Sequence, residues 1–339
     1  MRIGFILPAN YALSGGGQGV RVQALCQAEA LRKRGYEVLL MNPWEPFTGE
    51  PLDVIQYFQG GFAHFWIDKS IKHRAKLSVF APIIDTNESN RRYRLAARLG
   101  NLTGKFFTVP GVFQDQAQSA DLVVVRSSHE RDRIVQGLGI DPNKVEIVLN
   151  GVTPPPSTTD KLARRTLELP DEYILHVSAH TQQRKNVVRM IEAIGPTGKP
   201  LVIAGTAVPG PILDRIKALS KQYGNITLLG FLDRDVLESL YAGCRVFCLP
   251  SINEGTGLVA LEASVHGAGV VITKCGGPPD YFGEHGYLVD PYDVESIRSG
   301  LMKAWNEPGG EALCKHVVEN LTWEQSAMAL AKAYQKHMT

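Results

Sequence analysis

The chain has 339 residues, of which 44% are apolar and 21% are charged, and its formal net charge is +2. This length favours two domains, each large enough for its own core, and the composition is ordinary for a globular protein. The nearly balanced charge argues against a nucleic-acid-binding protein. Apolar runs reach only strand length, so no transmembrane helix is expected.

The amino-terminal run at residues 1–8 is too short in its apolar part for a secretory signal and is expected to form a first buried strand. Five cysteines, an odd number, show no metal-ligand spacing. Cys244 and Cys248 flank an apolar run and are interpreted as small core residues. Together these features favour a reducing cytoplasm.

The first half of the chain alternates strand-like and helix-like segments. Strands are expected at 2–7, 37–41, 53–58, 77–81, 121–125 and 145–149, and helices at 20–34, 92–99 and 128–138, the last capped by Ser128. Apolar strands alternating with helices predict a parallel sheet covered on both faces.

Residues 150–160 contain three prolines and are expected to form a semi-rigid linker. The alternation then resumes, with strands expected at 173–177, 201–204, 226–229, 246–249 and 270–273 and a last helix at 323–337 after Thr322. The pattern predicts an α/β protein of two doubly wound, Rossmann-like domains facing each other across a cleft. We assign residues 1–152, joined by 322–339, to the first domain and 153–321 to the second.

The segment 250–263 is the most informative part of the chain. It places Glu254 and Glu262 eight positions apart, across a turn with Gly255 and Gly257 and the start of a helix. Glycines allow close approach of a ligand, and the free amides of a helix start favour an anion. Helical rise separates the two carboxylates by roughly 12 Å at most. The segment therefore predicts two carboxylates that flank a diphosphate, each binding the hydroxyls of a different sugar.

Arg184 and Lys185 follow an expected strand and precede a helix. Two adjacent cations in this position suit phosphate oxygens, although a solvated basic pair is the alternative. The neighbouring glutamate turn favours the phosphate interpretation.

Residues 14–19 form a glycine-rich loop after the first strand. A flexible turn and a dinucleotide fingerprint are alternatives, but the fingerprint lacks a third glycine at Val20 and an acidic residue after the second strand. We interpret Gly16 and Gly17 as part of a loop of backbone donors.

Two further polar groups are ambiguous. Asp233 and Asp235 are spaced like a metal-binding Asp-x-Asp pair, but a helix N-cap and a first-turn acid explain both, so no metal is expected. His64 lies among aromatic residues, which is typical of a packed histidine. His64 and Asp85 are nevertheless candidate contacts of the reacting sugar.

Residues 69–105 carry nine Lys or Arg against Asp85 and Glu88. A solvated helix face is one interpretation. The other is a patch for anionic lipid headgroups or a phosphate-bearing acceptor, and hence a peripheral contact at the inner membrane surface.

In these motifs the chain resembles a retaining, nucleotide-sugar-dependent family 4 glycosyltransferase of the GT-B fold. The resemblance covers nearly the whole length and is densest over 173–293. It is carried by residues 184–186, 229–231, 250–251, 254–262, 276–280 and 286–291 and by the terminal helix with Trp323.

The resemblance implies that the first domain lies on the acceptor side and the second binds the nucleotide sugar. The catalytic residues that it implies are Glu254, Arg184 and Lys185. It further implies that the donor is bound by Glu262 at the ribose, by Gly255, Thr256, Gly257 and Leu258 at the sugar, by Gly230, Phe231 and Leu232 near the base, and by Gly16 and Gly17. No cofactor or metal is implied.

Three departures from the family pattern affect these assignments. Ala179 stands where relatives often have an arginine, and Thr256 replaces an aromatic residue. The strand at 53–58 lacks the catalytic histidine that relatives often carry.

The resulting prediction is a retaining transfer of a sugar from a nucleotide diphosphate to an acceptor hydroxyl, in glycan, glycolipid or polysaccharide biosynthesis. A donor phosphate oxygen would receive the acceptor proton on the front side. The alternatives are an NAD(P)-dependent oxidoreductase, a nucleotide-sugar-binding protein with little turnover and, ranked low, a glycoside hydrolase.

Overall fold

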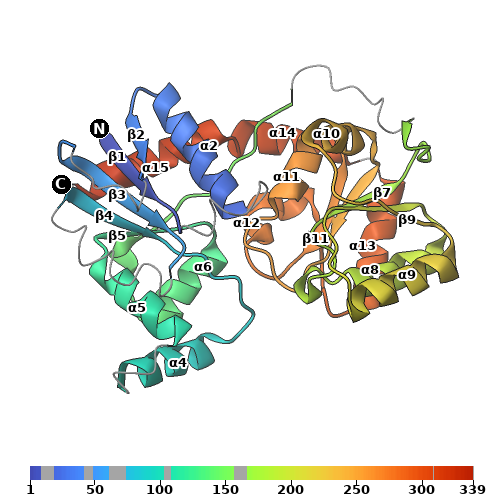
Figure 1. Ribbon diagram of the computed structural model, residues 1–339, viewed down its shortest axis with the longest axis horizontal. Coiled ribbons are helices and arrows are strands. Elements are labelled where there is room, and N and C mark those ends of the chain that lie inside the picture. Colours follow the sequence, from blue (N-terminus) through green and yellow to red (C-terminus); the bar gives the residue numbers. More distant parts are fainter. Residues whose placement is uncertain are drawn as a thin grey trace. The chain divides into compact units, whose positions relative to one another are not determined.

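The computed structural model describes residues 1–8, 19–41, 49–60, 74–102, 108–155, 166–307 and 309–338. The chain divides into an N-terminal unit, Met1–Gly151 with Trp323–Thr339, and a C-terminal unit, Val152–Thr322 (Figure 1). The sequence-based boundaries lie one residue from these limits. No helix in the described ranges is long and apolar enough to cross a membrane.

The N-terminal unit contains a six-stranded parallel sheet of order β2-β1-β3-β4-β5-β6. Its strands are β1 (Arg2–Ile6), β2 (Glu37–Leu40), β3 (Leu52–Phe58), β4 (Ala75–Ala81), β5 (Leu122–Val125) and β6 (Val145–Ile147). Each lies within two residues of its prediction. The parallel sheet predicted from apolar strands is therefore confirmed for this half.

Helices cover both faces of this sheet. Helices α2 (Gly19–Lys33) and α15 (Trp323–His337) lie on one face, and α5 (Val109–Ser119) and α6 (Ser128–Asp132) on the other (Figure 1). The buried amide of Gln27 donates to Ser326 Oγ at 3.1 Å and so joins α2 to α15. The terminal helix thus belongs to the N-terminal unit by direct packing.

Two local predictions in this unit were wrong. Helix α5 was missed, because its first turn contains Pro110 and Gly111; Thr108 Oγ1 caps it by accepting from Gly111 N at 3.1 Å. Proline is compatible with a first helical turn, where its missing N–H is not needed. The cap of α6 is Ser127, whose Oγ accepts from Glu130 N at 3.1 Å, and not Ser128.

The C-terminal unit contains a second six-stranded parallel sheet, of order β12-β11-β10-β7-β8-β9. Its strands are β7 (Ile174–Val177), β8 (Leu201–Ala204), β9 (Ile226–Leu228), β10 (Val246–Leu249), β11 (Gly269–Thr273) and β12 (Tyr287–Val289). The first five match the predicted strands to within one residue, and β12 was missed. The helices are α8 (Val187–Ile194), α9 (Pro211–Tyr223), α10 (Arg234–Gly243), α11 (Leu258–Val265), α12 (Pro278–Phe282), α13 (Val294–Asn306) and α14 (Gly310–Asn320).

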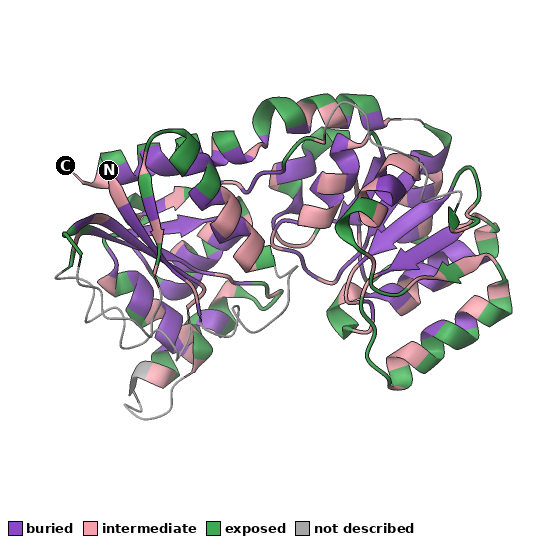
Figure 2. Cartoon of the chain, turned by 45° about the horizontal axis from the view of Figure 1, so that its top comes forward, coloured by how far each residue is buried: buried purple, intermediate pink, exposed green. Residues whose placement is uncertain are grey.

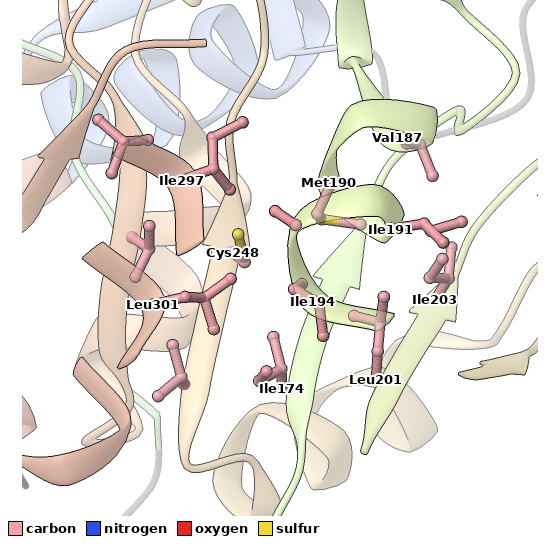
Figure 3. Packing of buried hydrophobic residues seen from close by; sticks show 14 of the residues in the cluster. Ile174, Val187, Met190, Ile191, Ile194, Leu201, Ile203, Cys248, Ile297 and Leu301 are labelled. Carbon is pink, nitrogen blue, oxygen red and sulfur yellow. The ribbon is translucent and has the colours of Figure 1, made fainter. Parts of the chain in front are cut away.

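The core of this unit fixes the helix that follows β7. Helix α8 buries Val187, Met190, Ile191 and Ile194, the spacing of one helical face, against β7, β8 and α13 (Figure 3). The strands beneath are buried along their length (Figure 2). The loop before α8 is therefore held at a fixed place at the carboxyl end of β7.

The buried cysteines confirm their interpretation as core residues. Cys244 is 8% exposed and Cys248 is fully buried. Burial raises the pKa of the Cys244 thiol to about 12 and that of Cys248 further. Both thiols therefore stay protonated and act as small apolar side chains.

Candidate functional site

The site is built from two loops at the carboxyl ends of adjacent parallel strands. Strand β7 pairs with β10, so the short helix η4 (Gln183–Lys185) and residues 250–257 start side by side. Ile252 N donates to Arg184 O at 2.8 Å. The side chain of Asn186, a residue in the left-handed region, donates to Pro250 O at 2.9 Å and to Pro291 O at 2.7 Å. These bonds fix the basic pair against the glutamate turn.

The centre of the site is the carboxylate of Glu254, a residue that is only 7% exposed. Its Oε1 accepts from Lys185 Nζ at 2.5 Å and from Ser251 Oγ at 2.7 Å, and it lies 3.6 Å from Arg184 Nη1. A buried carboxylate is costly unless it is paired and hydrogen-bonded. The structure therefore brings together the three residues for which the resemblance implied a catalytic role.

The backbone of Glu254 is held by the Gly276-Gly277 motif. Glu254 N donates to Cys275 O at 3.3 Å, and Gly277 N donates to Glu254 O at 2.9 Å. Gly276 has φ +98°, and a Cβ there would lie 2.1 Å from Glu254 O. Only glycine permits this conformation and this approach, so the motif serves to position Glu254.

Helix α11 begins directly after the glutamate turn. Gly257, with φ +80°, occupies the N-cap position and supplies no side-chain cap. The amides of Leu258 and the next residues are then candidate donors to an anion. Thr256 is 4% exposed, and its hydroxyl donates to Tyr281 OH at 3.2 Å. Thr256 is thus used in packing the turn.

Glu262 lies farther along α11 and forms a second polar cluster. Its Oε1 accepts from Arg234 Nη1 at 2.7 Å and its Oε2 from Tyr241 OH at 3.1 Å. Burial lowers the pKa of Arg234, but the charges and hydrogen bonds of Glu262 and Glu238 together outweigh this, so the pKa is raised. Burial, followed by the charge of Glu262, raises the pKa of Tyr241 well above its usual value. Sequence reasoning did not identify either partner of Glu262.

The Asp-x-Asp pair lies at the start of α10. Asp233 occupies the predicted N-cap position with an extended backbone, but its side chain makes no capping hydrogen bond; Asp235 lies in the first turn. Across the described ranges, no three His, Cys, Asp or Glu side chains are grouped to hold a metal ion. The position of the cap is confirmed, whereas the capping bond is not formed.

The loops after β7, β8 and β9 are also joined. Gly205 N donates to Gly230 O at 3.0 Å, and at φ +118° a Cβ on Gly205 would lie 2.0 Å from Ser178 O. Phe231, next to Gly230, is 72% exposed, and Leu232 is partly buried. An exposed aromatic ring held by a fixed loop can stack against a flat group.

His176 is a buried residue of this sheet edge that sequence reasoning missed. Its Nδ1 lies 2.7 Å from Cys248 O and its Nε2 2.7 Å from Ser178 Oγ. A carbonyl only accepts, so Nδ1 carries the proton and Nε2 accepts from the hydroxyl. Burial lowers the pKa of His176 to about 3. The neutral ring thus ties β10 to the loop after β7.

The candidates of the N-terminal unit fall into two groups. Gly16, Gly17 and His64 lie outside the described residues. Asp85 Oδ1 accepts from Arg126 Nη2 at 3.1 Å, and the same guanidinium contacts the buried carboxylate of Glu130 at 2.8 Å. In the structure Asp85 is therefore part of an ion-pair network.

A cavity of about 220 Å³ lies beside η4 and α8. Its lining includes Gln183, Asn186 and Ile252 but not Lys185, Glu254 or Glu262. His180 also lines it, and His180 Nδ1 is buried without a hydrogen-bond partner in the described part of the chain. The cavity is therefore next to, and distinct from, the Glu254 cluster.

Comparison with known proteins shows similarity to glycosyltransferases. Residues 159–322 match the family model of glycosyl transferases group 1. The serotype-specific mannosyltransferase WbdA of Escherichia coli is 30% identical over 203 residues, which are 55% of this chain and 25% of WbdA. A D-inositol 3-phosphate glycosyltransferase of Rhodococcus jostii is 25% identical over 308 residues, 82% of this chain and 66% of the relative. The chain thus spans between a quarter and two thirds of these relatives.

A solved structure is similar in fold over the whole chain. The Anabaena protein HepE, in complex with UDP, superposes with a TM-score of 0.72 at 18% identity and covers 99% of this chain and 100% of HepE. At this identity the likeness shows the fold alone. The family match is thus confined to residues 159–322 of the C-terminal unit, and the chain as a whole has the GT-B fold.

Proposed function

We propose that this protein is a retaining glycosyltransferase that moves a sugar from a nucleotide-diphosphate sugar to an acceptor hydroxyl in glycan, glycolipid or polysaccharide biosynthesis. The observation that carries the proposal is the contact of Lys185 and Arg184 with Glu254, at the carboxyl ends of β7 and β10. The names of the relatives, a mannosyltransferase and an inositol phosphate glycosyltransferase, support a sugar transfer. UDP bound to HepE supports a nucleotide donor.

In this proposal the basic pair binds the diphosphate. The Lys185 ammonium has three N–H donors, of which Glu254 Oε1 takes one. Arg184 is half exposed, with 47% of its side chain accessible, so its guanidinium can turn toward a phosphate. The first backbone amides of α11 add further donors, and no side-chain cap occupies them. A diphosphate here would be bound by two cationic side chains and by backbone amides.

The two carboxylates would bind hydroxyls on either side of the diphosphate. Glu254 would accept from hydroxyls of the transferred sugar, together with the backbone amides at Thr256, Gly257 and Leu258. Glu262 would accept from the ribose, in competition with Arg234 and Tyr241, which now hold it. Phe231 offers the exposed ring against which the base would stack, beside Gly230 and Leu232.

The proposed reaction forms a bond from the acceptor oxygen to the anomeric carbon and breaks the bond from that carbon to the phosphate oxygen. Both occur on the same face of the sugar, so configuration is retained. The acceptor proton passes to a phosphate oxygen of the leaving nucleoside diphosphate. Charge grows on this group as the bond breaks, and Lys185, Arg184 and the α11 amides stabilise it selectively. These groups supply the positive charge without a metal or other cofactor.

The N-terminal unit is proposed to bind the acceptor. Gly16, Gly17, His64 and Asp85 remain its candidate contacts. A cytoplasmic location and a peripheral contact of the basic region 69–105 with the inner membrane surface complete the proposal.

A thermal-shift panel of nucleotides and nucleotide sugars tests the donor class. A ligand present at 100 times its dissociation constant adds about 2.7 kcal/mol to the free energy of unfolding. We expect stabilisation by a uridine or guanosine diphosphate and its sugar. Stabilisation by a nicotinamide cofactor with no response to these diphosphates would instead favour the oxidoreductase.

Product analysis tests the reaction itself. Proton NMR of the product should show the anomeric configuration of the donor, and an inverted product would exclude the retaining route. Glu254→Ala and Lys185→Ala should each abolish transfer in a protein that is still folded. Normal rates in either variant would contradict the site assignment.

A further inference from the structure

Helix α4 (Asn90–Leu102) presents apolar side chains away from the core of the N-terminal unit. Tyr93 and Ala97 are 5% and 0% exposed and join the core, whereas Leu95 and Leu99 are 59% and 51% exposed. At about 100° per residue, the two leucines lie on the side of the helix opposite the buried pair. Helix α4 packs on α5, away from the sheet (Figure 1). A surface helix directs its apolar stripe to the core, so two half-exposed leucines on the opposite side give this helix a second apolar face.

Arginines flank the outward stripe on both sides. Arg91 and Arg98 project to one side of the leucines and Arg92 to the other, and all three are exposed. The helix contains no acidic residue. None of the three arginines forms an ion pair with a carboxylate in the ranges that the structure describes. The outward face is therefore apolar along its middle and cationic along both edges.

The start of α5, which packs on α4, also has an exposed apolar residue. Thr108 Oγ1 donates to Ala96 O at 2.8 Å and so fixes the start of α5 against α4. The next residue, Val109, is 52% exposed. Helix α4 and the start of α5 thus carry three exposed apolar residues, of which the two leucines lie on the outward face of α4.

We propose that α4 is an interfacial helix by which the N-terminal unit docks on an anionic lipid bilayer. Leu95 and Leu99 enter the boundary between headgroups and acyl chains, and the arginines bind the headgroups. A helix with an apolar stripe and a basic polar face binds membranes in this way. This docking helix would form the membrane contact that is part of the proposed function. Its exposed leucines and arginines are observed whether or not the protein transfers a sugar.

The charge pattern favours lipid over two other occupants. In a symmetric pair of copies joined through this face, the same surface meets itself, so the basic edges of the two copies would come together with no acidic residue on the helix to pair them. A nucleic acid would engage the arginines but leave the central leucines without an apolar partner. A bilayer surface satisfies both the charged edges and the apolar middle.

Co-sedimentation with vesicles tests the proposal. The full chain should bind vesicles of phosphatidylglycerol and phosphatidylcholine in equal parts, and should not bind pure phosphatidylcholine. Arg91→Gln, Arg92→Gln and Arg98→Gln combined should weaken binding about 100-fold at low salt, since each basic residue near the surface contributes about fivefold. Leu95→Ala with Leu99→Ala should weaken it at least about tenfold, because each change removes several inserted carbon atoms.

A matched control removes three exposed charges elsewhere. Lys217, Lys221 and Lys303, all exposed in the C-terminal unit, changed together to Gln should leave vesicle binding within about twofold of wild type. Equal binding to both kinds of vesicle, or wild-type binding by both α4 variants, would overturn the proposal. So would a self-associating wild type that the leucine changes convert to monomer in sedimentation velocity. Thermal shifts with nucleotides on the same samples test the donor site separately. Loss of vesicle binding and loss of nucleotide binding can therefore be told apart.

Discussion

The contact between Lys185 and Glu254 can be tested by a double-mutant cycle. The ammonium and the carboxylate are 2.5 Å apart, and their side chains are 11% and 9% exposed. Lys185→Met keeps the length of the side chain and removes its charge. Glu254→Gln keeps the shape of the carboxylate and removes its charge. Each single change leaves the other charge buried, and the double change removes both.

The size of the effect follows from what remains around each charge. Removing one partner of a buried ion pair costs about 3–5 kcal/mol. After Lys185→Met, Ser251 still donates to Glu254, and Arg184 is 3.6 Å away and free to approach. We therefore expect a loss of about 2–3 kcal/mol in the free energy of unfolding for each single variant. The double variant should lose about 1 kcal/mol or less, since neither charge is left unpaired.

Urea and thermal unfolding of the four proteins measure the cycle. Each single variant should lower the melting temperature by roughly 5–10 °C, and the double variant should recover most of it. Sugar transfer should be lost in all three variants, because neither charge can act on the donor once it is removed. Strictly additive losses of stability would refute the electrostatic coupling. Transfer by the stable double variant would show that the pair is structural only.

Three further predictions follow from neighbouring groups. Glu262→Gln should weaken binding of a nucleoside diphosphate in calorimetry by about tenfold yet leave binding of the 2′,3′-dideoxy analogue unchanged, since only the ribose hydroxyls are lost as partners. Gly276→Ala should lower the free energy of unfolding by at least about 2 kcal/mol and reduce transfer. Gly267→Ala is the control, because Gly267 has φ +86° but nothing lies within 4 Å of the added Cβ. In urea unfolding it should show only the smaller cost of the backbone conformation. His176 has a pKa lowered to about 3, so below pH 6.5 the unfolded chain binds a proton that the folded chain does not. Its contribution to the free energy of unfolding should therefore fall by about 1.4 kcal/mol for each pH unit from about 6.5 toward 3. Urea unfolding at several pH values measures this slope, and His176→Asn should reduce it.

The sequence predicted the fold well because local and global signals agree. Short apolar strands separated by helix-length segments permit one architecture, and both sheets proved parallel in all their pairings. The errors occurred where the local signal was misleading. The Pro110 and Gly111 pair concealed α5, and two consecutive serines, Ser127 and Ser128, left the cap position open.

The candidate site was only partly accessible to sequence reasoning. The basic pair and Glu254 could be grouped because both follow strands whose carboxyl ends share an edge. The partners of Glu262 could not, because Arg234 and Tyr241 are 28 and 21 positions away, on another helix. The tie from His176 to Cys248 likewise spans 72 positions and carries no motif. Contacts of this kind are set by tertiary packing.

Thr256 shows how a departure from a family pattern acquires a physical meaning. In the family pattern that the chain resembles, this position is usually aromatic, and Thr256 has no ring. In the structure the Thr256 hydroxyl donates to Tyr281 OH, so an aromatic ring is supplied from α12 next to the same turn. The chain therefore retains an aromatic group beside the glutamate turn, although from another element.

The remaining N–H donors of Lys185 suggest a reason for a buried ion pair at a place where apolar residues would cost less free energy of desolvation. A buried pair alone is weak support for stability, because desolvation cancels much of the attraction. Lys185, however, has two N–H donors beyond the one that Glu254 Oε1 accepts. In the proposed reaction, one ammonium would hold both the carboxylate that binds the sugar and the phosphate that leaves, on opposite sides of the bond that breaks. Such a bridge would fix both groups before the reaction, and the loss of either charge would remove this positioning.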